Sequence, residues 1–324
     1  MNKPKRRRIL AWAIAITTLI TTPSMAQSHR SDNSYPSRPV TLIVPYGAGG
    51  STDVIGRAIA ESLSRQLGQP VVVENKPGAA GAMGVLDMLS AKPDGYRLTM
   101  SPAGIFRQPH LQPTRYDPIK DLTYIASFLT FDFAVAVRAE SPIKTVDDLV
   151  KFAKADPDGV SYGTSGLHTG NHVVGAALAK DQGIKMTHIP YKGDSDNIAA
   201  LLGQQINMAI TTNTVLNHVK AGTVRVLAIS GSERNPTFEG VPTLRELGYG
   251  VAVSTPMGIS GPAGLPRPIV EALDAAIKAA LEDPKVKSQY GNLGIRPLYM
   301  NNQAYSDFAR KTFADEKELV KILN

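Results

Sequence analysis

The chain has 324 residues, contains no cysteine and carries a formal net charge of +7 at pH 7. The lack of cysteine excludes disulfides, thiolate metal sites and a cysteine nucleophile. The length allows two domains of ordinary size, each with a core of its own.

The first 26 residues have the pattern of a secretory signal peptide. Five basic residues at positions 3–8 precede an apolar run at 9–20, and the small-residue ending is Ser24-Met25-Ala26. The alternative is a retained membrane anchor, but an apolar run of about 12 residues is short of the roughly 20 that span a bilayer. We therefore expect cleavage after Ala26 and export to the periplasm.

Removal of this leader would take away most of the positive charge. The leader holds five basic and no acidic residues, so the formal charge would fall from +7 to 7 − 5 = +2. A mature chain with so small a charge and no cluster of Lys and Arg gives little support to nucleic-acid binding.

In chain order, the apolar spacing and turn residues of the first half predict alternating strands and helices. The predicted strands are 40–44, 71–73 and 96–100, and the predicted helices are 54–67 and 84–91. Such alternation is typical of a parallel sheet with helices packed on it.

From about Phe128 the same alternation begins again, which implies a second, similar α/β lobe. The predicted strands are 133–137, 160–162, 186–189, 206–210 and 224–229, and the predicted helices are 146–154, 171–180, 197–202 and 215–221. After Tyr249 we expect an extended segment at 251–259, a turn at 261–266 and two C-terminal helices.

A glycine-rich turn, Tyr46-Gly-Ala-Gly-Gly50, lies between the first strand and the first helix. Its backbone N–H groups can approach a ligand, and Ser51, Thr52 or Asp53 can cap the helix that begins near Val54. Since a helix N-terminus carries partial positive charge, the turn is suited to an anion. A tight turn without a ligand is the other interpretation.

The turn lacks the features of nucleotide sites. It has no Gly-Lys-Ser/Thr, and Thr52 stands where a dinucleotide fingerprint needs its third glycine. A second loop rich in Gly, Ser and Thr, at 163–170, follows a predicted strand of the second half. Because open α/β sheets bind ligands at the carboxyl ends of their strands, we expect the two loops to meet across a cleft.

Ser165 with His172 or His188 suggests a hydrolase, because a serine nucleophile needs a neighbouring base. The nucleophile-elbow pattern fails, since Leu167 occupies the place of its last glycine. His168 and His172 could join a third ligand on a metal, but a glycine between them weakens the helix that would align them. We predict no catalytic residue, no metal site and no cofactor, and we expect Ser165 to be a hydroxyl donor or helix cap.

Two cationic residues follow strands at the same expected edge. Lys192, within Tyr191-Lys-Gly193, could reach into the cleft or lie in solvent. Arg107 could pair a second ligand carboxylate in a bidentate manner, or it could lie at the surface.

Several motifs, in their order along the chain, resemble the tripartite tricarboxylate transporter receptor family, whose members are TctC-like or Bug-type extracytoplasmic solute-binding proteins. The motifs are Pro36-Ser-Arg-Pro39, Val44-Pro-Tyr-Gly-Ala-Gly-Gly50 with Asp53 and Arg57, Glu74-Asn-Lys-Pro-Gly78, Pro93-Asp-Gly-Tyr96, Tyr162-Gly-Thr-Ser-Gly166, Pro190-Tyr-Lys-Gly193, Arg225-Val-Leu-Ala228, Val241-Pro-Thr243 and Gly261-Pro-Ala-Gly264. They cover essentially the whole mature chain.

The resemblance implies a two-lobed periplasmic binding protein fold of type II, each lobe a mostly parallel sheet flanked by helices. With chain crossings near Ser127 and Ala252, lobe 1 would comprise residues 27–127 and 252–324 and lobe 2 residues 128–251, and the lobes would close by a hinge at the crossings.

The function that the resemblance implies is capture of a small organic carboxylate, a di- or tricarboxylate or an aromatic acid. The receptor would be a monomer and no enzyme, and it would serve membrane transporter subunits of the tripartite tricarboxylate type. The alternatives are a ligand-sensing paralogue with a signalling partner and a secreted serine hydrolase that uses Ser165.

The resemblance also implies a ligand site made by both loops. One carboxylate would be held by backbone and hydroxyl donors of the first loop, Tyr46, Ala48, Gly49 and Gly50, and of the second, Thr164, Ser165 and Gly166. The further ligand-binding residues that we expect at this cleft are Ser101, His168, Tyr191, Gly193 and Thr211.

Three positions depart from the pattern of the family. Many relatives carry Phe-Asp where this chain has Ile210-Thr211, glycine where it has His168, and a tryptophan near Pro256. Because Thr211 removes a fixed negative charge, we expect a weaker preference for ligands that carry a positive amino group.

Overall fold

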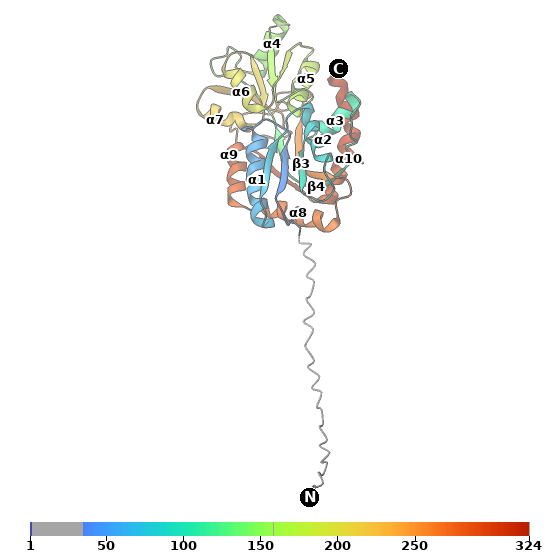
Figure 1. The fold of residues 1–324 in the computed structure, drawn as a ribbon. Coiled ribbons are helices and arrows are strands. Elements are labelled where there is room, and N and C mark those ends of the chain that lie inside the picture. Colours follow the sequence, from blue (N-terminus) through green and yellow to red (C-terminus); the bar gives the residue numbers. More distant parts are fainter. Residues whose placement is uncertain (2–34, 158, 324) are drawn as a thin grey trace. The chain divides into compact units, whose positions relative to one another are not determined.

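The structure is a computed structural model that describes Met1 and residues 35–157 and 159–323. Nearly all of the expected signal peptide, including the cleavage position after Ala26, lies outside the described residues. From Tyr35 onward the chain forms one unit that contains two sheets (Figure 1). We call the parts built on the first and the second sheet lobe 1 and lobe 2.

The sheet of lobe 1 has the strand order β11-β4-β10-β3-β1-β2. Strand β1 is parallel to β2 and β3, whereas β10 is antiparallel to β3 and β4, and β11 is antiparallel to β4. The strands are β1 (Val40–Val44), β2 (Val71–Asn75), β3 (Arg97–Ser101), β4 (Leu122–Asp132), β10 (Ser254–Pro262) and β11 (Arg296–Met300).

Apolar side chains on both faces of this sheet explain its helical cover. Val40, Leu42 and Val44 belong to one buried core, and Ile43, which points the other way, belongs to a second. The first core includes residues of α1 (Ser51–Leu67), α8 (Arg267–Ala280) and α9 (Pro284–Leu293). The second includes residues of α2 (Ala82–Leu89), α3 (Gly104–Leu111) and α10 (Asn302–Leu319).

The sheet of lobe 2 has the order β7-β6-β8-β5-β9, with β6 parallel to β7 and β8 and with β5 antiparallel to β8 and β9. The strands are β5 (Ala134–Arg138), β6 (Ser161–Thr164), β7 (Thr187–Pro190), β8 (Met208–Thr211) and β9 (Val224–Ile229). The helices are α4 (Val146–Ala155), α5 (Gly170–Gln182), α6 (Asp194–Leu202) and α7 (Leu216–Lys220). Single turns of 3-10 helix are η1 (Ala79–Gly81), η2 (Asn213–Val215) and η3 (Val320–Ile322).

Both sheets are mixed, whereas we expected them to be mostly parallel. In lobe 1 the reason is that β4 runs toward lobe 2 and β10 runs back from it, so the two strands pair antiparallel. The predicted elements also omitted β4, α3 and β11. Three helices, α8, α9 and α10, follow the turn near Gly264, where we expected two.

The chain passes between the sheets at two places. Strand β4 remains in the first sheet through Asp132 and β5 begins at Ala134, so the first crossing lies beyond the expected position near Ser127. The return lies between the end of β9 at Ile229 and the start of β10 at Ser254. The buried Asp132 carboxylate, at the end of β4, connects the first residues of β10 and β11. It accepts hydrogen bonds from Ser254 Oγ at 2.6 Å and from Arg296 Nε at 2.9 Å.

In the described part of the chain, no helix combines the length and the apolar character that a membrane crossing requires.

Candidate functional site

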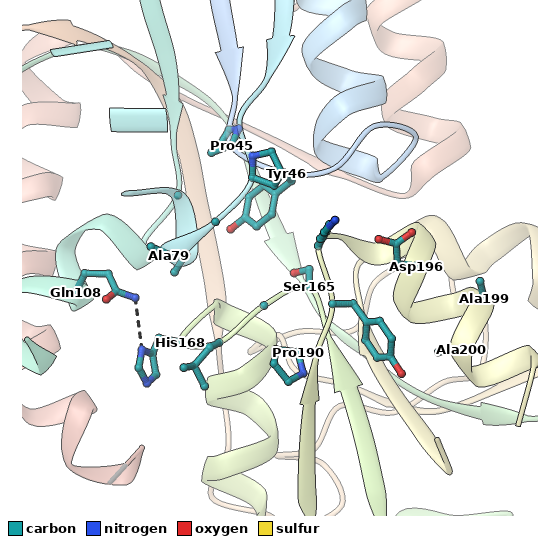
Figure 2. Close-up of a pocket in the computed structure, with 18 of the residues that line it drawn as sticks. Pro45, Tyr46, Ala79, Gln108, Ser165, His168, Pro190, Asp196, Ala199 and Ala200 are labelled. Carbon is teal, nitrogen blue, oxygen red and sulfur yellow. Dashed lines mark hydrogen bonds between the residues drawn. The ribbon is translucent and has the colours of Figure 1, made fainter. Parts of the chain in front are cut away.

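The two glycine-rich loops face each other across a cleft between the lobes (Figure 2). Tyr46 approaches from the loop before α1, and Ser165 and His168 come from the loop before α5. Gln108 of α3 and Tyr191, which follows β7, also line this cleft, whose volume is about 930 Å³. Loops at the carboxyl ends of strands from both lobes therefore form one cavity, as expected for an open α/β sheet.

A smaller chamber shares Tyr46 and Ser165 with this cleft. Its walls include the first residues of α1 and of α5, together with Asp194 and Thr212. The residues contributed by the two helix starts are Gly50, Ser51, Thr52, Thr169, Gly170 and Asn171. The chamber measures about 20 Å³, which is the room for one water-sized group. Because the first N–H groups of a helix have no partner within it, both starts offer donors and partial positive charge here.

The first loop is held by Asp53. Helix α1 begins at Ser51, with Gly50 as its N-cap and no side-chain cap, so the capping role expected for Ser51, Thr52 or Asp53 is wrong. The Asp53 carboxylate lies in the first helical turn and accepts from Gly49 N at 2.9 Å and from Arg57 Nε at 3.0 Å. The N–H of Gly49, whose φ of +79° favours glycine, therefore points to Asp53.

The loops of the two lobes also bind each other. Gly47 N donates to the Lys192 carbonyl oxygen at 3.0 Å. The hydroxyl oxygen of Ser51 lies 2.6 Å from that of Thr212, across the interface between the lobes. A Cβ atom on Gly193 would lie 3.3 Å from Gly47 N, so the approach of the two backbones depends on a residue without a side chain.

In the second loop, the amide of Asn171 fixes Ser165. Asn171 Nδ2 donates to Ser165 Oγ at 3.0 Å and to the Ile210 carbonyl oxygen at 2.9 Å. Within residues 35–157 and 159–323, the hydrogen-bond partners of Ser165 Oγ are both atoms of Asn171, and no imidazole is among them. This geometry gives no support to the hydrolase interpretation, because no base is placed to activate the hydroxyl.

Three imidazole rings pack behind the second loop. The ring centroids of His172 and His188 are 3.9 Å apart and nearly parallel, and His168 lies 5.8 Å from His172. His188 Nε2 is 2.6 Å from Thr164 Oγ1, and His172 Nδ1 accepts from His168 N at 3.0 Å. The described residues contain no group of His, Asp and Glu arranged to hold a metal.

Burial and mutual repulsion keep these rings neutral. Burial lowers the pKa of His172 to about 3 and that of His188 to about 4, with further lowering by the neighbouring imidazoles. Burial and Arg107 also lower the pKa of His168. The rings therefore act near neutral pH as uncharged packing and hydrogen-bonding groups.

Arg107 does neither of the things that we expected of it. Only 2% of its side chain is exposed, and it makes a bidentate ion pair with Glu316 of α10, at 2.7 and 2.6 Å. A third bond runs from Arg107 Nη1 to the His168 carbonyl oxygen at 2.7 Å. Arg107 thus links lobe 1 to the second loop of lobe 2, and it is neither a surface residue nor a free partner for a ligand carboxylate. The φ of His168 is +60°, a conformation that this contact helps to hold.

Six of the twelve expected binding residues line one of the two cavities, and six do not. Those on the cavity walls are Tyr46, Gly50, Ser165, Gly166, His168 and Tyr191. Those off the walls are Ala48, Gly49, Ser101, Thr164, Gly193 and Thr211. Ser101 Oγ bonds Ser260 Oγ in the core, and Thr211 is fully buried with no partner for its hydroxyl.

The polar residues of the inner chamber that were not among the expected binding residues include Asp194, Thr212 and Asn171. The signal for Asp194 was its place directly after Tyr191-Lys-Gly193, at the carboxyl end of a strand. Asn171 follows the second loop, at the start of α5, and Thr212 follows strand β8, so both lie at that same edge of the sheet.

Residues 55–324 match the sequence model of the TctC family, described as tripartite tricarboxylate transporter family receptor. The chain belongs to this family. A relative from Cupriavidus necator, a UPF0065 protein in the gbd 5' region, is 38% identical over 314 residues, which are 97% of this chain and 95% of the relative.

Solved structures agree with this membership. The periplasmic binding protein BugD has a TM-score of 0.85 at 32% identity, over 89% of this chain and 98% of BugD. A protein from R. palustris with adipate gives 0.84 at 27% identity, over 89% of this chain and 98% of its own. MatC from Rhodopseudomonas palustris with bound malate gives 0.82 at 26% identity, over 88% of this chain and 100% of its own.

The predicted family, the two-lobed fold and the solute-binding function are thereby confirmed. The family consists of solute-binding receptors, and its solved members include periplasmic binding proteins.

Replacing Arg107 by Met in this TctC-family receptor should lower the free energy of unfolding by about 3 to 5 kcal/mol, because Glu316 would remain buried without its partner. The double variant Arg107→Met with Glu316→Leu should recover most of that loss. Urea unfolding measures both. As a control, Arg310→Met removes an exposed pair with Asp307 and should change the free energy of unfolding little. A loss for Arg107→Met as small as that of the control would contradict the buried pair.

The stability of the protein should fall as the pH drops below about 6.5, the usual pKa of an unfolded histidine. The unfolded state binds protons there, whereas His172 and His188 in the folded state resist protonation until about pH 3 to 4, so unfolding is favoured across that interval. The variant His172→Gln with His188→Gln should show a flatter profile of melting temperature between pH 7.5 and 5. The control His218→Gln should keep the wild-type slope, and equal slopes for all three proteins would refute the assignment.

Proposed function

We propose that this protein captures a small organic carboxylate in the cleft between its lobes, acting as a receptor without catalysis. The observation that carries the proposal is the pair of helix N-termini, α1 and α5, that line one small chamber. Two such ends attract an anion without any cationic side chain. Relatives solved with adipate and malate support a carboxylate as the anion.

In this proposal the donors to the carboxylate come from both lobes. The first turn of α1 contributes the N–H groups after Gly50, and Ser165 and Gly166 contribute from the second loop. Gly49 and Thr164 would hold the loops in place and would not bind the ligand, because the Gly49 N–H donates to Asp53 and the Thr164 hydroxyl bonds His188. Since donors from each lobe reach the anion together only when the lobes meet, binding and closure are coupled.

The rest of the ligand would occupy the outer cleft. A volume of about 930 Å³ is within the range of sites for small molecules. Its walls combine apolar surface, such as Leu167 and Pro190, with the phenol of Tyr191 and the ring of His168. These residues would decide how long and how polar a ligand the receptor accepts.

The receptor would act outside the cytoplasm. The leader supports export, and cleavage after Ala26 would release a soluble monomer into the periplasm. The family description supports delivery of the ligand to membrane transporter subunits of the tripartite tricarboxylate type.

Gly193→Val should weaken carboxylate binding by about tenfold or more, equivalent to about 1.4 kcal/mol, because the added side chain separates Gly47 from Lys192. Calorimetric titration with adipate and malate measures the effect. Gly291→Val is the control, since a Cβ atom there meets nothing within 4 Å. Unchanged affinity in Gly193→Val would refute closure through these loops.

Ser165→Ala separates a receptor from a hydrolase. The receptor should retain measurable affinity for the same acids, because the backbone donors remain. If the wild-type protein hydrolyses an ester substrate and Ser165→Ala loses all turnover, the protein is the secreted hydrolase and not a receptor.

A further inference from the structure

Exposed apolar side chains line the outer cleft on both sides. Tyr46 and Ser165 line this cleft as well as the inner chamber, so a carboxylate held at their junction leaves the rest of the ligand in the cleft. Figure 2 shows Ala79 of lobe 1 and Pro190 of lobe 2 on opposite sides of this space. The exposed apolar residues of the walls are Pro77 and Ala79 of lobe 1 and Leu167, Pro190 and Ala199 of lobe 2.

Leu167 has the largest of these side chains and is 49% exposed. Hydrogen bonds of both neighbouring residues hold its backbone in place. On one side, the Gly166 carbonyl oxygen accepts from Thr169 Oγ1 at 2.7 Å. On the other side, His168 N donates to His172 Nδ1 at 3.0 Å. Because the loop is already ordered, an apolar ligand group that covers Leu167 removes apolar surface from water at a small cost in conformational entropy.

Charged groups contribute little to the same walls. Of the twenty described residues that line the cleft, two are charged, Lys192 and Asp196, and these are exposed and opposite in sign. Burial and Arg107 lower the pKa of His168, so its ring is neutral. The Arg107 guanidinium is buried in its ion pair with Glu316 and is not among the lining residues. A second carboxylate on the ligand would therefore lose water against walls without an excess of positive charge.

The size of the cleft allows a ring or a long chain. The loops of the two lobes are in contact through Gly47 and Lys192, and the cleft beside them still measures about 930 Å³. Sites for drug-sized molecules span roughly 300–1,000 Å³ and are mostly apolar, with a few polar groups that fix the orientation of the ligand. The outer cleft has this composition, with the carboxylate-binding junction at one side.

We propose that this receptor selects monocarboxylates with an apolar body, an aromatic ring or an alkyl chain, over dicarboxylates of the same skeleton, and that this body covers Leu167. The inference rests on the proposed carboxylate-binding function and adds the class of ligand. Its physical basis is that an apolar body buries exposed side chains of both lobes, whereas a second carboxylate would be desolvated without a cationic partner.

The test compares acids that share a carbon skeleton and differ by a second carboxylate. The pairs are hexanoate and adipate, octanoate and suberate, and benzoate and terephthalate. Dissociation constants are measured by calorimetry at pH 7.5, where all of these carboxyl groups are ionised. In at least one pair the wild-type receptor should bind the monocarboxylate about tenfold or more tightly than the dicarboxylate.

Two variants of Leu167 test the role of its side chain. Leu167→Asn keeps a similar size and removes the apolar surface, so it should weaken binding of the preferred monocarboxylate about three- to tenfold and change that of its dicarboxylate partner less than about twofold. Leu167→Arg supplies a guanidinium for a second carboxylate and should shift the preference toward the dicarboxylate by about tenfold or more.

Leu247 provides the matched controls. It is 43% exposed and does not line the outer cleft. Leu247→Asn and Leu247→Arg should therefore keep the wild-type affinities for both members of each pair. An equal shift of preference in Leu167→Arg and Leu247→Arg would reflect the added net charge and would overturn the role of Leu167.

The outcomes separate this inference from the proposed function. Dicarboxylates that bind as well as or better than their monocarboxylate partners in all three pairs overturn the ligand class and leave the proposed receptor function standing. A preference for the monocarboxylate that both Leu167 variants retain in full overturns the role of Leu167. Binding of none of the six acids by the wild-type protein counts against the proposed carboxylate receptor itself.

Discussion

The contact between the loop after β1 and the loop after β7 is the constraint on which the site depends. It consists of a backbone bond from Gly47 to Lys192, and a hydroxyl contact between Ser51 at the start of α1 and Thr212 after β8 lies beside it. Gly193 permits it, because any side chain there would press on Gly47. With the loops together, the starts of α1, α5 and α6 share one chamber, and every proposed binding group follows from that arrangement.

The polar groups behind the loops keep this arrangement without placing cationic side chains at the chamber. The Arg107 guanidinium forms an ion pair with Glu316 and donates to the His168 carbonyl oxygen, while the stacked imidazoles remain uncharged. The polar part of the chamber lining therefore consists of helix starts, hydroxyl groups and the side chain of Asp194, whose pKa is raised by burial.

Local sequence patterns predicted much of this structure and missed what depends on distant partners. The strands 40–44 and 224–229 were predicted at their observed bounds, because apolar β-branched runs end at turn residues. The meeting of the two loops followed from the parallel strands that precede them. Arg107 could not be placed, since its partner Glu316 is 209 positions away, and β11 was missed because its residues are only partly buried. Asp194 was overlooked although its position after a strand end carried the same signal as the loops.

Native mass spectrometry of the purified receptor would show what the cleft binds, because a closed cleft retains its ligand. We expect a complex with one small molecule per chain, released on denaturation and identified as a compound with a carboxyl group. A retained compound without any carboxyl group, bound in the same cleft, would show that the protein is not a carboxylate receptor.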